Sequence, residues 1–196
     1  MPKRPPEQHT GFLVWCTAVI CAILTVAVII AGIIVFIGYI AIRPKVPQIS
    51  VTQAQLDVFE YDQAGILVVK VTIFISAEND NAKADASFYN TRFVLGFQGI
   101  TLAYLHADPF DVSRNNSLKL KYEVESSPIP LGPAEQNDVY FSLLRNAIYF
   151  DLKGNTRTRW RIGFLGSVKF SLSLDCQLRF SRIGDVIYPK CSTKSK

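Results

Sequence analysis

The chain is poor in the side chains that most enzymes use for chemistry. It has two histidines, His9 and His106, in 196 residues, and it contains no Gly-x-Gly-x-x-Gly, P-loop or Gly-x-Ser-x-Gly pattern. A hydrolase triad requires a histidine beside a nucleophile, and His106 is better explained as a surface turn residue. We therefore expect no catalytic residue, no cofactor and no enzymatic activity.

Metal ligands are also too sparse for a metal centre. The four cysteines include no Cys-x-x-Cys pair, so a structural zinc site is not expected. Calcium takes about six to eight oxygen ligands, whereas the carboxylate pairs Glu78/Asp80 and Asp108/Asp111 offer fewer. We interpret both pairs as solvated turns and predict no metal.

Charge is absent from one long segment. No Asp, Glu, Lys or Arg occurs in the 32 residues from Gly11 to Ile42, which argues against an ordinary soluble protein. A helix of this length extends about 48 Å, and the hydrocarbon core of a bilayer is about 30 Å thick. The apolar part of a cleaved signal peptide is only about 7–15 residues long, so we favour a membrane anchor. We place its core at Leu13–Ile37, with Trp15 and Tyr39 at opposite interfaces.

The charges beside this segment do not orient it. Two flanking cations precede the segment and two follow it: Lys3, Arg4, Arg43 and Lys45. With Glu7, these flanks contribute +3 of the net charge of +5. The rest of the chain carries only +2, so we predict no nucleic-acid partner. The sequon at Asn115 and the pair Cys176 and Cys191 favour a domain outside the cytosol. We therefore predict a type II topology, with Asn115 glycosylated.

The anchor has two further features that stay open. Cys16 and Cys21 are sites for palmitoylation, or they are simply small apolar residues of the span, which is the interpretation we prefer. Small residues recur at the spacing that lets helices approach closely: Ala18, Ala22, Ala27 and Ala31. This spacing is a hint of a homo-oligomer.

Alternation of apolar and polar residues, typical of half-buried strands, recurs in the rest of the chain. Val168–Phe180 and Leu118–Glu125 alternate without interruption, and the more apolar Ile66–Ala77 should lie centrally in a sheet. Shorter strands are predicted at Thr91–Phe97, Ile100–Leu105, Ile148–Leu152 and Arg157–Ile162, with a tight turn at Gln98-Gly99. Asp138–Asn146 has helical spacing instead.

These elements predict an all-β fold, namely an antiparallel β-sandwich with one short helix, preceded by a single transmembrane α-helix. Residues 1–10 form a short cytosolic tail, 11–42 the anchor, 43–50 a Pro-containing stem, and 51–196 an extracytoplasmic sandwich domain.

Four basic side chains form the densest cationic stripe of the domain: Lys153, Arg157, Arg159 and Arg161. Their alternation in one predicted strand points the three arginines in the same direction. One hypothesis is contact with anionic lipid headgroups or an acidic cell-wall polymer. The alternative, which we favour, is a charged sheet face that discourages edge pairing.

A disulfide between Cys176 and Cys191 is predicted from their positions about a turn. Ile183-Gly184-Asp185 lies midway between the two cysteines. A hairpin centred there brings them side by side, within the roughly 4.4–6.8 Å between Cα atoms that a disulfide requires.

Several stretches match one family in order and spacing. They are Val71–Asn81, Phe88–Asn90, Gly99–Leu102, Pro109-Phe110, and Arg159–Gly163 followed by Cys176. With the short tail, single span and Pro-containing stem, the chain resembles the plant harpin-induced-like (NHL) proteins, which carry a group-two late-embryogenesis-abundant domain. Asp80 stands where that family usually has proline, and Asn79 and Asn81 on either side can still form Asx turns.

The resemblance implies an immunoglobulin- or fibronectin-III-like sandwich, residence in the plasma membrane, and roles in pathogen defence and stress. It implies no catalytic residues. We interpret the chain as a membrane-anchored, non-enzymatic protein that acts through protein–protein contacts at the cell surface; the endoplasmic reticulum is the second choice of membrane. Two alternatives stay open: a tether from membrane to cell wall or to another membrane, and a module that binds lipid or a small apolar ligand.

Overall fold

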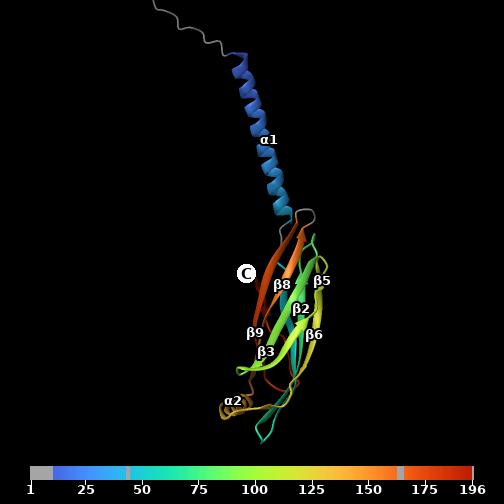
Figure 1. Ribbon diagram of the computed structural model, residues 1–196, viewed down its shortest axis with the longest axis vertical. Helices are drawn as coiled ribbons and strands as arrows, with labels where there is room; N and C mark the ends of the chain where they lie inside the picture. Colours follow the sequence, from blue (N-terminus) through green and yellow to red (C-terminus); the bar gives the residue numbers. More distant parts are fainter. Residues whose placement is uncertain (1–10, 43–44, 163–165, 196) are drawn as a thin grey trace, which may run out of the picture. The chain divides into compact units, whose positions relative to one another are not determined.

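The computed structural model describes residues 11–42, 45–162 and 166–195 (Figure 1). The chain divides into two compact units, residues 1–44 and residues 45–196. The described part of the first unit is one helix, and the second unit contains all of the described strands. The predicted cytosolic tail at residues 1–10 lies outside the described residues.

The helix α1 (Phe12–Ile42) is continuous over 31 residues. Its Val14–Gly38 part is long and apolar enough to cross a membrane, a test that a single span and a signal sequence both satisfy. The hydroxyls of Thr17 and Thr25 each donate a hydrogen bond to a backbone carbonyl of the preceding turn, at 2.9 and 2.7 Å. These bonds satisfy polar groups that an apolar environment would otherwise leave unpaired.

The second unit, as far as it is described, consists of twelve strands and the short helix α2 (Pro133–Leu144). The strands are β1 (Gln48–Tyr61), β2 (Ile66–Asn79), β3 (Ala86–Phe97), β4 (Ile100–Ala107), β5 (Phe110–Val112), β6 (Asn116–Glu125), β7 (Ile129–Pro130), β8 (Ile148–Ile162), β9 (Gly166–Phe180), β10 (Val186–Ile187), β11 (Cys191–Ser192) and β12 (Lys194–Ser195). The helix α2 lies at one end of the long strands (Figure 1).

The strands form two antiparallel sheets. Sheet A has the order β10–β1–β2–β6, with β11 also beside β1 and β7 beside β2. Sheet B has the order β12–β9–β8–β3–β4, with β5 also beside β3. The inward side chains of both sheets form one hydrophobic core. The predicted antiparallel β-sandwich preceded by an apolar helix is therefore confirmed, and β2 is a central strand as expected.

Aromatic rings join the two sheets inside the core. Phe59 of sheet A meets Phe97 and Phe150 of sheet B, with ring centroids 5.6 and 6.3 Å apart. Phe180 packs against Phe150 at 5.6 Å with nearly perpendicular rings. Edge-to-face contacts of this kind add to the stabilisation that comes from burying the rings.

The longest predicted elements lie where the alternation placed them. β9 contains the predicted strand Val168–Phe180, and β6 contains Leu118–Glu125. The β3–β4 turn has positive φ at Gln98 (47°) and Gly99 (83°), which is the conformation of a two-residue hairpin turn. The helix α2 begins five residues earlier than predicted, at Pro133, because proline is well suited to a first helical turn.

The strand β1 was missed, and it begins inside the predicted stem at residues 43–50. Its pairing with β2 contains two bulges, one between Val51 and Gln53 and one between Leu56 and Val58. Each bulge shifts the inward-facing position by one residue. The apolar positions of β1 therefore do not alternate along the whole strand, and the periodicity that reveals the other strands fails here.

The strand β8 is continuous, whereas two separate strands were predicted on either side of Gly154. A Cβ atom at Gly154 would collide with the Arg92 carbonyl oxygen and with Phe93 of the neighbouring strand β3. Glycine is required here for the close approach of the two backbones, and it does not end the strand.

Two buried threonines of β8 differ in their hydrogen bonding. The hydroxyls of Thr156 and Thr91 are 2.7 Å apart and bonded to one another across β8 and β3. The hydroxyl of Thr158, two residues further along the same face, has no hydrogen-bond partner among the described residues. The side chains of Thr156 and Thr158 are both almost completely buried.

This difference predicts opposite responses to the same substitution. Thr156→Val is expected to lower the free energy of unfolding by about 1–3 kcal/mol, because it leaves the Thr91 hydroxyl buried and unpaired. Thr158→Val, the matched control, is expected to leave stability unchanged or higher, because no hydrogen bond is lost. Urea unfolding of the two variants, followed by circular dichroism, measures the difference; equal losses would contradict it.

Candidate functional site

Three arginines alternate along β8 on one exposed surface. Arg157, Arg159 and Arg161 all lie on the outer face of sheet B, and Lys153 lies on the same face. A strand rises about 3.3 Å per residue, so neighbouring members of this row are about 6.6 Å apart along β8.

The register of sheet B adds two cations that sequence reasoning missed. Arg92 of β3 lies opposite Asn155, and Lys169 of β9 lies opposite Arg159. Residues directly opposite one another in antiparallel strands share a face, and both added side chains are exposed. We name the following five residues the basic face: Arg92, Arg157, Arg159, Arg161 and Lys169.

The basic face is poorly balanced by carboxylates. Lys153, at its margin, lies 3.9 Å from Asp175, and both of these side chains are more than half exposed. Within the described part of the chain, no member of the basic face forms an ion pair. The Arg159 guanidinium lies over the Tyr89 ring, 5.9 Å from its centroid. Its charge stays available, because an aromatic ring does not neutralise it.

Two hollows open on this side of the sandwich. The first has a volume of about 240 Å³ and is lined by Asn90, Arg92, Asn155, Arg157 and Ser171. It lies where a bulge separates Tyr89 from Arg92 in the pairing of β3 with β8, and Asn90 has a positive φ of 52°. In the second hollow, Arg161 and Lys83 are balanced by the carboxylates of Asp85 and Asp111, so positive charge dominates only the first.

Of the two acidic pairs considered as calcium ligands, Glu78 and Asp80 have other partners. The Glu78 carboxylate accepts a hydrogen bond of 3.1 Å from Ser50, and Asp80 lies 3.9 Å from the Lys45 ammonium. Among the described residues, no three His, Cys, Asp or Glu side chains gather as a metal site would require. His106 is exposed on β4, opposite Arg92.

The Asn-Asp-Asn stretch has a structural role. The Asn79 amide nitrogen, fully buried, donates to the carbonyls of Ala84 and Val112 at 2.9 and 3.1 Å. The Asn79 carbonyl oxygen accepts from the Asn81 backbone N–H at 3.2 Å, which is the predicted Asx turn. The Asn79 side chain of sheet A is therefore hydrogen-bonded both to the segment that leads into β3 and to the end of β5.

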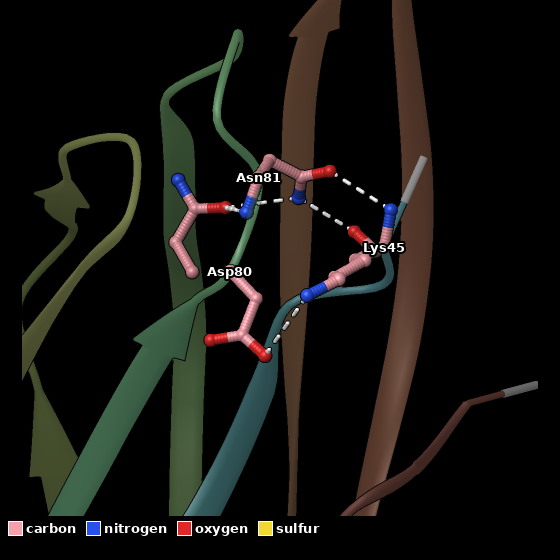
Figure 2. Close-up of polar contacts among 4 residues, drawn as sticks. Lys45, Asp80 and Asn81 are labelled. Carbon is pink, nitrogen blue, oxygen red and sulfur yellow. Dashed lines mark hydrogen bonds and ion pairs between the residues drawn. The ribbon is translucent and has the colours of Figure 1, made fainter. Parts of the chain in front are cut away.

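Asn81 binds the first described residue of the domain. Its side-chain oxygen accepts a hydrogen bond of 2.8 Å from the Lys45 backbone N–H, and its amide nitrogen donates to the Lys45 carbonyl (Figure 2). The Asn81 amide therefore imitates the backbone of a neighbouring strand. The ion pair of Asp80 with Lys45 lies beside these bonds and is exposed.

The Cys176–Cys191 disulfide is formed, with Cα atoms 5.5 Å apart, but the predicted hairpin geometry is wrong. Cys176 lies on β9 in sheet B, whereas β11, which carries Cys191, pairs with β1 in sheet A. The bridge therefore joins the two sheets. Cys16 and Cys21 of α1 are free thiols.

The predicted glycosylation site lies in an exposed loop. Asn115 connects β5 with β6, has a positive φ of 50°, and donates its backbone N–H to the Asn81 carbonyl at 2.9 Å. Its exposed side chain is accessible to modification.

The fold thus defines a strand-rich domain that follows one apolar helix and has a charged sheet face as its candidate site. No family model matches the chain. The chain is 22% identical over 180 residues to NDR1/HIN1-like protein 12 of Arabidopsis thaliana, which covers 90% of this chain and 85% of that protein. This similarity over most of the length supports the resemblance to the harpin-induced-like proteins. The group-two late-embryogenesis-abundant domain stays a prediction.

A solved structure also aligns with the chain. It is a protein from Archaeoglobus fulgidus, with a TM-score of 0.33 and 9% identity, over 68% of this chain and 98% of that one. A likeness this remote carries no argument about fold or function.

The contacts of Asn81 predict a local loss of stability. Asn81→Ala removes both bonds to Lys45, and we expect the free energy of unfolding to fall by about 1–3 kcal/mol. The matched control Asp80→Asn removes only an exposed ion pair and should cost less than about 1 kcal/mol. Hydrogen–deuterium exchange of a peptide that begins at least two residues before Lys45, so that the Lys45 amide is retained, should accelerate in Asn81→Ala alone. Unchanged exchange there would contradict the assignment.

Proposed function

We propose that the chain is a single-pass, membrane-anchored, non-enzymatic protein of plant defence or stress responses, and that its sandwich domain contacts protein partners at the cell surface. The observation that carries this proposal is the similarity to an NDR1/HIN1-like plant protein, because the alignment covers 90% of the chain. The fold adds support, since the described part of the sandwich offers exposed sheet faces and loops on which partners could dock.

The plasma membrane, with the domain outside, is the proposed location. An inter-sheet disulfide is stable in oxidising compartments and rare in the cytosol. The exposed sequon at Asn115 is consistent with the same side of the membrane. The charged residues on either side of the apolar segment do not distinguish the two orientations, because two cations lie on each side.

A second candidate function is a tether from the membrane to the cell wall. The basic face favours it, because a surface with unbalanced positive charge attracts acidic polymers. A pocket for lipid or a small apolar ligand is less well supported. The layer between the sheets, where such a ligand would bind, is filled by buried side chains such as Phe88, Phe93 and Phe150.

Proximity labelling in infected and resting leaves tests the first proposal. A ligase fused to the C-terminus of the full chain should label a set of proteins that changes on infection. The control fuses the ligase directly after residue 50, which removes the sandwich and keeps the helix. Because the proposed contacts belong to the sandwich, the control should not label that set. Identical sets for the two fusions would contradict the proposal.

The orientation has its own test. Protease added to intact protoplasts is expected to remove a C-terminal tag and to spare an N-terminal tag, because the domain is proposed to lie outside. A glycosidase that removes N-linked glycans should increase gel mobility, and Asn115→Gln should abolish that shift. Detergent-permeabilised cells, in which both tags should be lost, are the control. Loss of the N-terminal tag alone would reverse the assignment.

A further inference from the structure

The first hollow combines two guanidinium groups with three uncharged polar side chains. The guanidinium groups of Arg92 and Arg157 line it together, and each is a planar fork that pairs with a carboxylate through two hydrogen bonds. Asn90, Asn155 and Ser171 both donate and accept hydrogen bonds. Their acceptor atoms match a ligand that carries hydroxyl groups as well as negative charge.

Positive charge continues beyond the hollow in a line. Arg159 and Arg161 follow Arg157 along β8, and the row extends about 13 Å at a rise of about 3.3 Å per residue. Lys169 lies beside Arg159 on β9. A linear ligand with regularly repeated anionic groups would contact several of these cations at once, whereas a single small anion would contact two.

The exposed apolar side chains of the domain argue against a lipid surface as the ligand. A surface that binds a bilayer combines cations with apolar side chains that enter it. The largest such cluster lies instead on α2, where Tyr140, Phe141 and Leu144 are 50–63% exposed. On the outer face of sheet B, Tyr104 of β4 is 68% exposed and Tyr149 of β8 is 37% exposed. A tyrosine offers an apolar ring and a hydroxyl group, which suits a sugar ring.

We propose that the outer face of sheet B binds a linear polysaccharide of uronic acids. One carboxylate is held between Arg92 and Arg157, neighbouring hydroxyl groups bond to Asn90, Asn155 and Ser171, and further carboxylates follow the row along β8. This inference rests on the proposed placement of the domain outside the cell and deepens the tether candidate. Its binding test does not depend on orientation, so its failure is distinguishable from a failure of the orientation test.

The experiment uses the full chain in nanodiscs of phosphatidylcholine, so that the lipid carries no net charge. The probe is an oligogalacturonate of about ten units, titrated at low ionic strength by calorimetry. The same oligomer with every carboxylate methyl-esterified tests the need for charge. The test variant is Arg92→Gln with Arg157→Gln. The control variant, Lys119→Gln with Lys190→Gln, removes the same charge from exposed positions outside sheet B.

We expect the acidic oligomer to bind, the methyl ester to fail, and the test variant to bind at least about tenfold more weakly than the control variant. Thermal melting of both variants should match the unmodified chain, because all four substituted side chains are exposed. Absence of binding, or equal weakening by the two variants, would overturn the proposal. So would arginine-dependent binding to phosphatidylserine vesicles without binding of the oligomer, because it would identify the face as a membrane site.

Discussion

The buried amides of Asn79 and Asn81 fix the end of the sandwich that contains Lys45. Asn79, the last residue of β2 in sheet A, donates hydrogen bonds to the carbonyls of Ala84 and Val112. Ala84 precedes β3 and Val112 ends β5, and both of these strands belong to sheet B. The Asn81 side chain forms hydrogen bonds with both the backbone N–H and the carbonyl of Lys45. A buried amide left without partners is costly, so these bonds hold together segments that are more than thirty residues apart. The two asparagines of the family resemblance therefore have a physical role, whereas the Asp80 side chain between them is exposed.

Alternation along the sequence predicted six of the seven long strands, and it failed where the backbone departs from a regular ladder. β9 and β6 are regular and were predicted almost to the residue. β1 contains two bulges that shift its apolar positions, and so its pattern was not visible. Gly154 was interpreted as a break because glycine usually weakens a strand. Glycine is required there because the β3 backbone approaches β8 too closely for a Cβ atom at this position.

Contacts between strands were beyond what one sequence reveals. The cysteine pair was predicted for a hairpin, yet the chain after Cys176 crosses from sheet B to sheet A before Cys191 pairs beside β1. The pairing was correct although the assumed symmetry about a hairpin turn was not. In the same way, the arginines of β8 were visible as a stripe, whereas Arg92 and Lys169 joined them only through the register of sheet B.

The two outer faces of the sandwich differ in how their charges are balanced, and this difference determines which face suits an acidic ligand. On sheet A, Lys70 lies 3.3 Å from Glu125, and Lys121 pairs with Glu123 and holds the pKa of that carboxyl below its usual range. An approaching polyanion would have to compete with these carboxylates. On sheet B, no ion pair among the described residues involves the basic face, and carboxylates line a hollow only beside Arg161. The field of the other cations therefore extends into solvent over a Debye length of about 8 Å. Of the two outer faces, as far as they are described, that of sheet B therefore carries the less balanced positive charge and suits a polyanion better.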